Sequence, residues 1–410
     1  FAHGITGDMN TKLARHLQKR GCRNTATLPG FEYETTDEGI VIRRYTGIDT
    51  NPRIESEYGG KPVLEISDRA FENCVHLKRI EIPDRVRIIG QDSFKGCSNL
   101  ESVVIPDSVT VIGDHAFETC TNLSSVEMGT GVKEIGAHAF HGCQSLTSIV
   151  IPDGVTEVKD DTFYMCKALT SIVIPDGVTV IGKSVFYDCR NLISATIPDS
   201  VTMIDESAFM SCDSLESVTI PDSVTIIRPY AFNGCDNLTY VSLSCSLTEI
   251  GTSVFGYCKN LPSIVIPEGV RTIGNTAFDT CGKLTSVTLP DTLQKIGTGA
   301  FERCPSLSSI NIPDSLTEIE GFAFYGCSSL TSVTIPESVT KIKKGTFENC
   351  ANLASVTIPD SVTNIEEKPF QNCRKLTVSC SRGSHAWKYC KDQKIPVESA
   401  RSGFFGRFLK

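Results

Sequence analysis

Histidine and carboxylate side chains recur in register in the first half of the chain. Asp92, His115, His138 and Asp161 follow one another at intervals of 23 residues, and His141 lies three positions after His138. Imidazole nitrogens and carboxylate oxygens are ligands for divalent metal ions, so this column is a candidate metal site. An exposed segment accepts any polar side chain, however, and we interpret the column as solvated surface and predict no metal.

The segment 177–184 matches the pattern of a phosphate-binding loop, Gly-x-x-x-x-Gly-Lys-Ser. That chemistry requires a glycine-rich loop between a strand and a long helix. Val178 and Ile181, however, occupy the same 23-residue apolar columns as Val109 and Ile112. A backbone whose side chains belong to a core column cannot wrap a phosphate, so we predict that this segment binds no nucleotide.

An acidic residue follows a proline position in eleven of 13 repeats. These residues are Asp84, Asp107, Asp153, Asp176, Asp199, Asp222, Glu268, Asp291, Asp314, Glu337 and Asp360. The preference of Asp for turns explains the column. Stacked like charges repel, which leaves calcium bound between repeats as an alternative. We predict no cofactor.

The sequence contains no recognisable catalytic constellation. No nucleophile is accompanied by a base and an orienting partner, and the seven histidines are scattered. We therefore predict that the chain is not an enzyme and has no catalytic residues. An enzyme with an active site outside the repeats is disfavoured because residues 1–30 are too short to house one.

The residues above belong to a repeat of 23 positions without insertion or deletion. Phenylalanine marks it fourteen times, at 71, 94, 117, 140, 163, 186, 209, 232, 255, 278, 301, 324, 347 and 370. A cysteine follows each phenylalanine by three positions and a leucine by six. Such a period predicts a solenoid in which equivalent side chains stack directly above one another.

One unit spans residues 100–120. The β-branched stretch Leu-x-x-Val-x-Ile predicts a short strand that ends at Pro106, and Ala-Phe-x-x-Cys predicts a tight helical turn on the return path. The expected fold is an α/β repeat solenoid: a curved, right-handed leucine-rich-repeat stack with a parallel concave β-sheet and short helical or 3-10 turns on the return segments.

The 23-residue pattern Leu-x-x-Val-x-Ile-Pro, Val-x-x-Ile-Gly, Ala-Phe-x-x-Cys resembles the BspA-like leucine-rich repeat over residues 31–398. The resemblance implies the solenoid fold. It also implies a bacterial surface or secreted protein with a role in adhesion or host contact.

Composition and pattern divide the chain into five predicted segments. They are a basic N-terminal segment (1–30), an N-terminal cap half-repeat (31–66), a solenoid of about 14 coils (67–378), a C-terminal cap (379–398) and a basic aromatic tail or linker (399–410). The second cap is expected to contain a short helix and a last strand.

Fourteen of the 18 cysteines form the column that follows the phenylalanines. Parallel side chains in register cross-link poorly, so we predict buried free thiols. Cys22, Cys245, Cys380 and Cys390 lie off this column, and a bridge between Cys380 and Cys390 remains an alternative.

The concave sheet is the predicted ligand-binding surface. One of its exposed columns is serine in eleven of twelve repeats, and its seven central members are the candidate site residues Ser148, Ser171, Ser194, Ser217, Tyr240, Ser263 and Ser286. Small side chains that permit curvature and hydroxyl ladders explain the column without a ligand. The alternative is a hydroxyl lattice with Tyr240 as an anchor for a partner. Tyrosines on the return segments form a second candidate surface: Tyr164, Tyr187, Tyr230, Tyr257 and Tyr325.

These features favour a non-catalytic recognition module that binds a protein or a glycan as a monomer. A net charge of -9 argues against nucleic-acid binding, and no apolar run predicts a transmembrane span. The resemblance favours an extracellular or cell-surface location. A cytoplasmic scaffold or sensor domain of a larger protein is the alternative, supported by the reduced cysteine column and by the absence of a visible export signal.

Overall fold

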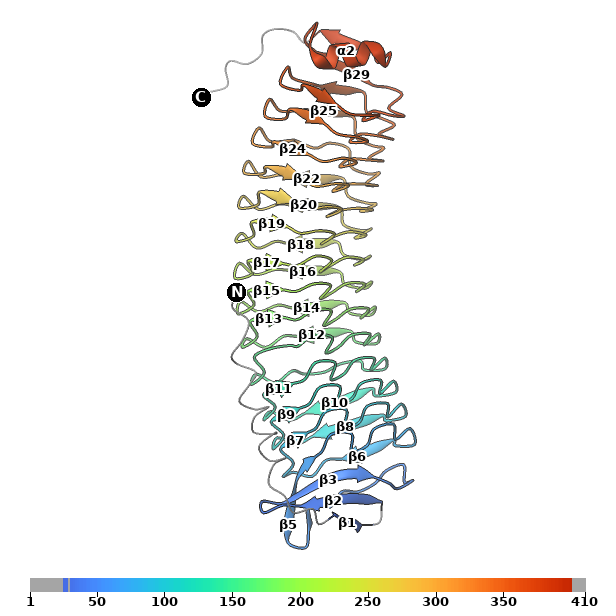
Figure 1. The fold of residues 1–410 in the computed structure, drawn as a ribbon, viewed down its shortest axis with the longest axis vertical. Coiled ribbons are helices and arrows are strands. Elements are labelled where there is room, and N and C mark those ends of the chain that lie inside the picture. Colours follow the sequence, from blue (N-terminus) through green and yellow to red (C-terminus); the bar gives the residue numbers. More distant parts are fainter. Residues whose placement is uncertain (1–24, 29, 400–410) are drawn as a thin grey trace.

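The computed structural model describes residues 25–28 and 30–399 as an elongated stack of coils (Figure 1). Successive repeats run from the end that contains the first strands to the end that contains a short helix. Each repeat lies next to the repeats that precede and follow it in the sequence. Most of the predicted segment 1–30, and residues 400–410 of the predicted tail 399–410, lie outside the described residues. The five predicted segment boundaries remain predictions.

The long ladder is a set of parallel strands formed by the Leu-x-x-Val-x-Ile stretch. Its strands are β6 (Arg79–Glu81), β8 (Ser102–Ile105), β10 (Ser125–Met128), β12 (Ser171–Val173), β14 (Ser194–Thr196), β16 (Ser217–Thr219), β18 (Tyr240–Ser242), β20 (Ser263–Val265), β22 (Ser286–Thr288), β25 (Ser332–Thr334), β27 (Ser355–Thr357), β29 (Thr377–Cys380) and β30 (Val397–Ser399). The strands pair in four hydrogen-bonded groups, β6 to β10, β12 to β18, β20 to β22 and β25 to β30. Up to β27 the pairing has the 23-residue offset, as in Ser102 with Ser125, whereas β29 pairs with β27 at an offset of 22 and β30 with β29 at 19. This confirms the predicted solenoid of stacked parallel strands.

A second parallel ladder, which the sequence pattern did not predict, runs along the Val-x-x-Ile-Gly stretch. Most of its strands have two residues: β5 (Lys61–Ile66), β7 (Ile88–Ile89), β9 (Val111–Ile112), β11 (Glu134–Ile135), β13 (Val180–Ile181), β15 (Met203–Ile204), β17 (Ile226–Ile227), β19 (Glu249–Ile250), β21 (Thr272–Ile273), β23 (Lys295–Ile296), β24 (Glu318–Ile319), β26 (Lys341–Ile342) and β28 (Asn364–Ile365). The last residue of each of these strands is an isoleucine that points into the core, as do Ile112 and its paired residue Ile135.

Within residues 30–399, the return segments form neither the predicted helical turns nor 3-10 turns. His115 and Thr119 both have φ of 57°, and equivalent positions before and after most of the phenylalanines are also left-handed. A left-handed residue breaks a right-handed helix. Alternate amides instead bond to the next repeat, as His115 N–H does to Ala137 O at 2.9 Å, while Cys120 N–H bonds within its turn to Phe117 O at 3.1 Å.

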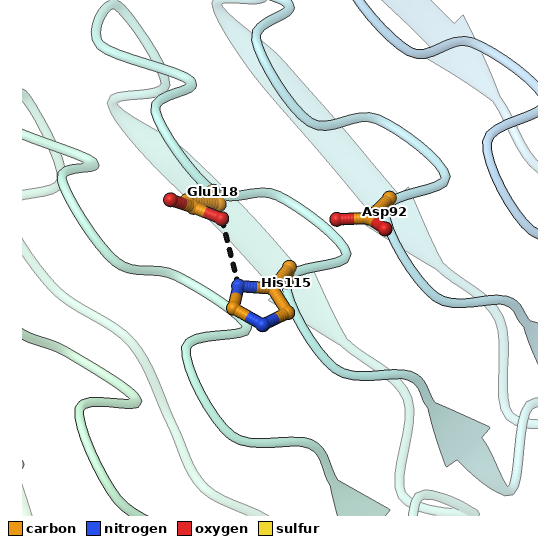
Figure 2. Close-up of side chains that lie close together, drawn as sticks. All are labelled: Asp92, His115 and Glu118. Carbon is orange, nitrogen blue, oxygen red and sulfur yellow. Dashed lines mark hydrogen bonds and ion pairs between the residues drawn. The ribbon is translucent and has the colours of Figure 1, made fainter.

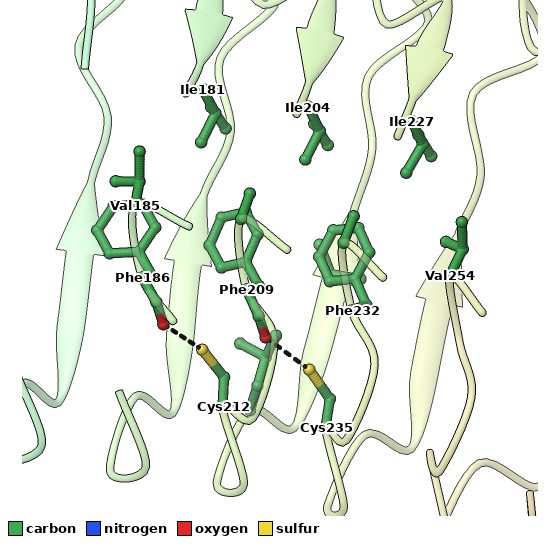
Figure 3. Close-up of a cluster of buried hydrophobic side chains, with 14 of the residues drawn as sticks. Ile181, Val185, Phe186, Ile204, Phe209, Cys212, Ile227, Phe232, Cys235 and Val254 are labelled. Carbon is green, nitrogen blue, oxygen red and sulfur yellow. Dashed lines mark hydrogen bonds between the residues drawn. The ribbon is translucent and has the colours of Figure 1, made fainter. Parts of the chain in front are cut away.

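The fourteen phenylalanines form one continuous column in the core. Consecutive ring centroids lie 4.9–5.8 Å apart from Phe71 to Phe370, with interplanar angles of at most 23°. Figure 3 shows Phe186, Phe209 and Phe232 of this column beneath isoleucines of the second ladder. Each buried ring contributes about 1.5–3 kcal/mol before chain entropy is subtracted. The column therefore holds both ladders together.

The cysteine column packs beside the phenylalanines as free thiols. Each Sγ from Cys97 to Cys373 donates to the carbonyl oxygen of the phenylalanine one repeat earlier, at 3.0–3.3 Å (Figure 3). Burial raises the pKa of Cys166 to about 12. All 17 described cysteines are free, including Cys380 and Cys390, so the bridge left open by the sequence is not formed.

Different structures cover the two ends of the stack. At the first end β1 (Thr25–Leu28), β2 (Phe31–Thr35) and β3 (Ile40–Tyr45) pair antiparallel, and β4 (Glu57–Tyr58) pairs antiparallel with β5. At the other end lies α2 (His385–Asp392), the only α-helix among the described residues. Ser384 caps it by accepting a hydrogen bond from Trp387 N–H at 3.1 Å. The caps protect the apolar edges of the first and last repeats.

Candidate functional site

The seven candidate site residues lie on one exposed surface, which we call the serine face: the outward side chains of the long ladder. Register pairs Ser171 with Ser194, Ser194 with Ser217, and Ser217 with Tyr240. Ser263 pairs with Ser286, and Ser148 is reached by a single bridge from Ser125. All seven side chains are exposed to solvent. The residues that the sequence analysis grouped are therefore aligned in the structure. Their role in binding stays a prediction.

Three exposed valines on the serine face, unlike Tyr240, were not singled out by the sequence analysis. Val150, Val173 and Val265 are 76, 65 and 66% exposed, and Tyr240 is 58% exposed. The valines occupy the outward position just before the last isoleucine of the strand, where alternation would have predicted a polar residue. An exposed valine is ordinary alone, but aligned neighbours on a sheet form a contact surface.

A shallow groove of about 370 Å³ lies between the repeats of Ser148 and Ser171. Val150, Val173, Asp153 and other residues line it together with the two serines. Ser148 belongs to the repeat that contributes only an isolated bridge to the long ladder. The groove therefore opens where the long ladder is interrupted.

Charge divides the serine face into two parts. From Thr147 to Thr357, the three outward positions of each Leu-x-x-Val-x-Ile stretch carry one charged residue, Glu216. In the three repeats before Thr147, the corresponding positions carry five: Lys78, Arg79, Glu81, Glu101 and Glu127. A groove of about 810 Å³ beside this charged part is lined by Arg53, Arg79, Glu81 and Glu127, among others.

The return face, by which we mean the second ladder and the turns after it, carries a compact group of potential ligands. Of these, Asp92 is buried and His115 and Glu118 are half-buried. Asp92, His115 and Glu118 each offer a ligand atom within 4.8 Å of the others (Figure 2). His115 Nδ1 lies 2.7 Å from Glu118 Oε2. Glu118 was missed because it follows a phenylalanine by one position and so falls outside the predicted column.

A lysine already neutralises this group. Lys95 Nζ lies 2.7 Å from Glu118 and 3.4 Å from Asp92. Burial tends to raise the pKa of Glu118, but hydrogen bonds from Lys95 and His115 outweigh it and lower that pKa. The hydrogen bond to Glu118 also raises the pKa of Lys95. These three carboxylate and imidazole groups are therefore arranged as an ion-pair network.

The other histidines of the predicted column lie in the next repeat. His138 Nδ1 is 3.4 Å from His141 Nδ1, and His138 Nε2 is 3.7 Å from Asp161 Oδ2. The imidazole of His115 stacks on that of His138, with 4.5 Å between ring centroids, and His141 stacks on Tyr164 at 4.6 Å. Burial lowers the pKa of His141 and raises that of Asp161.

Two further patterns from the sequence have plain structural roles. Within the segment 177–184, Val178 and Ile181 are fully buried and β13 pairs with β15, so the backbone is part of the second ladder. In the acidic turn column, Asp107 accepts a hydrogen bond from Thr130 N–H at 2.7 Å, and Asp222 accepts one from Cys245 N–H at 2.9 Å. Within the described residues, no three of these acids place one oxygen each within 4.8 Å of one another.

Comparisons with known proteins agree with the repeat pattern. A family model described as the BspA type leucine rich repeat region matches residues 64–191, 156–278 and 248–377. No protein with a curated description matches the chain. No helix among the described residues is long and apolar enough to span a bilayer.

Solved structures of bacterial leucine-rich-repeat proteins are similar over most of the chain. A leucine-rich cell surface protein from Faecalibacterium prausnitzii is 33% identical, with 94% of this chain and 100% of that chain covered and a TM-score of 0.54. A leucine-rich-repeat protein from Bacteroides ovatus is 27% identical, with 91 and 99% covered and a TM-score of 0.70. The pneumococcal vaccine antigen PcpA, 16% identical with 92 and 97% covered and a TM-score of 0.50, shares the fold.

Proposed function

The chain belongs to the BspA-type leucine-rich-repeat family, and we propose that it is a non-catalytic recognition module that binds a protein or glycan partner through the serine face. Leucine-rich repeats commonly bind other proteins and are generally non-enzymatic, and the comparisons indicate no catalytic family. The partner contacts the uncharged part of the face, from Ser148 to Ser286.

The observation that carries this proposal is the composition of the serine face. Ten successive repeats, from Thr147 to Thr357, present hydroxyls and valines to solvent with a single charged residue, Glu216. A surface that served solubility alone would carry charges of both signs. Interface cores are depleted of charge and enriched in tyrosine, which is the composition found around Tyr240.

The chemistry of the face favours a protein or a glycan over a charged ligand. Serine and threonine hydroxyls both donate and accept hydrogen bonds, so they match backbone amides and sugar hydroxyls equally well. Exposed valines at 150, 173 and 265 supply apolar contact area between the hydroxyls. Because the sheet lacks cations over this range, it offers nothing for phosphate groups to pair with.

We further propose that the protein acts at the bacterial surface or after secretion. The F. prausnitzii protein is described as a cell surface protein and PcpA as a vaccine antigen. Protease treatment of intact cells that produce the protein from its own gene tests the location. Digestion of the protein on intact cells supports a surface location, whereas full protection supports a cytoplasmic scaffold or sensor. The free thiols of the described residues favour the cytoplasmic alternative.

Binding is tested by comparing charge introduced on the two faces of the same three repeats. One variant carries Ser171→Arg, Ser194→Arg and Ser217→Arg on the serine face. Its matched control carries Thr179→Arg, Thr202→Arg and Thr225→Arg, three exposed threonines from the same repeats. Each protein is immobilised and probed with a glycan array and with solubilised surface proteins of cultured epithelial cells, and captured proteins are identified by mass spectrometry.

We expect the wild type and the threonine variant to retain the same specific partner and the serine variant to lose it. Because the arginines match in number and repeat, a difference between the variants reports the face and not the added charge. Equal capture by all three proteins would reject the serine face as the contact surface.

A further inference from the structure

The imidazole rings of His138 and His141 lie side by side on the return face, away from the residues proposed to bind a partner. The Nδ1 atoms of His138 and His141 lie 3.4 Å apart, whereas the ring centroids are 5.5 Å apart and the ring planes are tilted by 38°. The two nitrogens are therefore the parts of the rings that are turned toward each other. The sequence predicted no metal in this column, but from this geometry we propose that His138 and His141 chelate a tetrahedral divalent transition metal ion, for which zinc is the best match.

The separation of the nitrogens selects the coordination geometry. Zinc binds histidine nitrogen at about 2.0–2.1 Å, and two such bonds at the tetrahedral angle place the nitrogens about 3.3–3.4 Å apart. Adjacent ligands in a square-planar copper site at the same bond length would be only about 2.8–3.0 Å apart. The observed distance agrees with the tetrahedral value. It also fits an N–H···N hydrogen bond between the two neutral rings, which the ion would replace.

Neighbouring repeats hold both rings in place. His138 is backed by the stacked ring of His115, and His141 by the stacked ring of Tyr164, with interplanar angles of 8° and 10°. The carboxylate of Asp161 lies 3.7 Å from His138 Nε2, the nitrogen that the ion would leave free. At 3.7 Å this carboxylate is beyond hydrogen-bonding distance, so its contribution is electrostatic attraction for the bound cation.

The adjacent group of Asp92, His115 and Glu118 is a poorer site, although it contains more potential ligands. Lys95 Nζ lies within 3.4 Å of both carboxylates and would have to be displaced by the ion. Among the described residues, Asp161 forms no ion pair with lysine or arginine and instead lies beside His138. With two protein ligands, zinc keeps two positions for water or for a donor from another molecule.

Zinc binding is measured by isothermal titration of the full chain with zinc chloride at pH 7.5. Cys22 and Cys245 are replaced by serine in every protein, so that neither thiol competes. In this background we expect one ion per chain, lost in His138→Asn and in His141→Asn. Asp161→Asn should weaken binding by less than about 10-fold, because it removes a nearby negative charge but no hydrogen bond to a ligand. His385→Asn removes an exposed imidazole on α2 and should bind as the background does.

Two further readouts locate the ion and separate folding from binding. Anomalous diffraction at the zinc edge should place the ion between the two Nδ1 atoms. Zinc should raise the melting temperature of the background protein but not of the His138 and His141 variants, whose circular dichroism should be unchanged. The proposal is overturned if the background binds no zinc, if both variants retain binding, or if His115→Asn alone abolishes it.

Discussion

The serine face and the return face are built on the same core with the same 23-residue step, yet they carry opposite kinds of side chain. The return face holds ion pairs between repeats, such as Lys159 with Glu134 at 2.6 Å, Lys343 with Glu320 at 2.7 Å and Lys295 with Glu318 at 2.9 Å. The serine face carries one charged residue over ten repeats. Both faces are exposed, so exposure alone does not explain the difference in charge between them.

The largest expected effect comes from the core that both faces share. Phe209→Ala should lower the free energy of unfolding by about 3–5 kcal/mol, the cost of emptying a fully buried aromatic site. Because the ring stacks between neighbours in both directions, hydrogen exchange should accelerate together in β14 and β16 on one side and in β15 and β17 on the other. Loss of protection in one ladder only would show that the faces do not depend on one core.

A charge pattern tests whether the serine face is uncharged for structural reasons. Ser171→Arg, Ser194→Arg and Ser217→Arg stack like charges across two interfaces, which should destabilise the fold by about 0.4–2 kcal/mol. The alternating variant Ser171→Glu, Ser194→Arg and Ser217→Glu imitates the return face and should stay within about 0.5 kcal/mol of wild type. Urea unfolding measures both. If the alternating variant is as unstable as the uniform one, the lack of charge is structural and needs no ligand.

Acidification should lower the free energy of unfolding, because carboxylates on the return face have lowered pKa values in the folded protein. The hydrogen bond from Lys343 lowers the pKa of Glu320 relative to the unfolded chain, so Glu320 contributes stability above its unfolded pKa that is lost as the pH falls through its folded pKa. Glu320→Gln should therefore cost about 0.3–1 kcal/mol at pH 7 and nothing near pH 3. Urea titrations from pH 7 to pH 3 measure this difference, and a difference independent of pH would contradict the assignment.

The smallest expected effect on stability is at Tyr240. This ring is 58% exposed, so Tyr240→Ala should change the free energy of unfolding by less than about 0.5 kcal/mol. Binding should fall about 30-fold or more, equivalent to the 2 kcal/mol typical of an interface anchor. Tyr230→Ala is the matched control on the return face. Equal losses of affinity in the two variants, measured by surface plasmon resonance, would remove the distinction between the faces.

The sequence predicted the stacking because every repeat has the same length. Phe94, Phe117 and Phe140 must share one environment when 23 residues separate each pair, and the rings do stack. The serine register followed from the same rule. Two-residue strands such as Val111–Ile112 are too short for alternation to be visible, which is why the second ladder was not predicted.

The return segments were predicted as helical because Ala-Phe-x-x-Cys places apolar residues three apart. The pattern does not reveal that His115 and Thr119 adopt left-handed backbone conformations, since neither is glycine. Hydrogen bonds to the next repeat compensate for that conformation, and no spacing in one repeat records them. The contact between Glu118 and His115 depends on the same turn, so the 23-residue spacing of the histidines could not predict it.

Hydroxyl-radical footprinting with the captured partner tests the central claim most directly, because oxidisable side chains are exposed on both faces. Tyr240 and Val173 report the serine face, and Tyr230 and Tyr257 report the return face. We predict that the partner protects Tyr240 and Val173 from oxidation and leaves the two return-face tyrosines unchanged. Protection of Tyr230 and Tyr257 with Tyr240 still fully reactive would contradict the account.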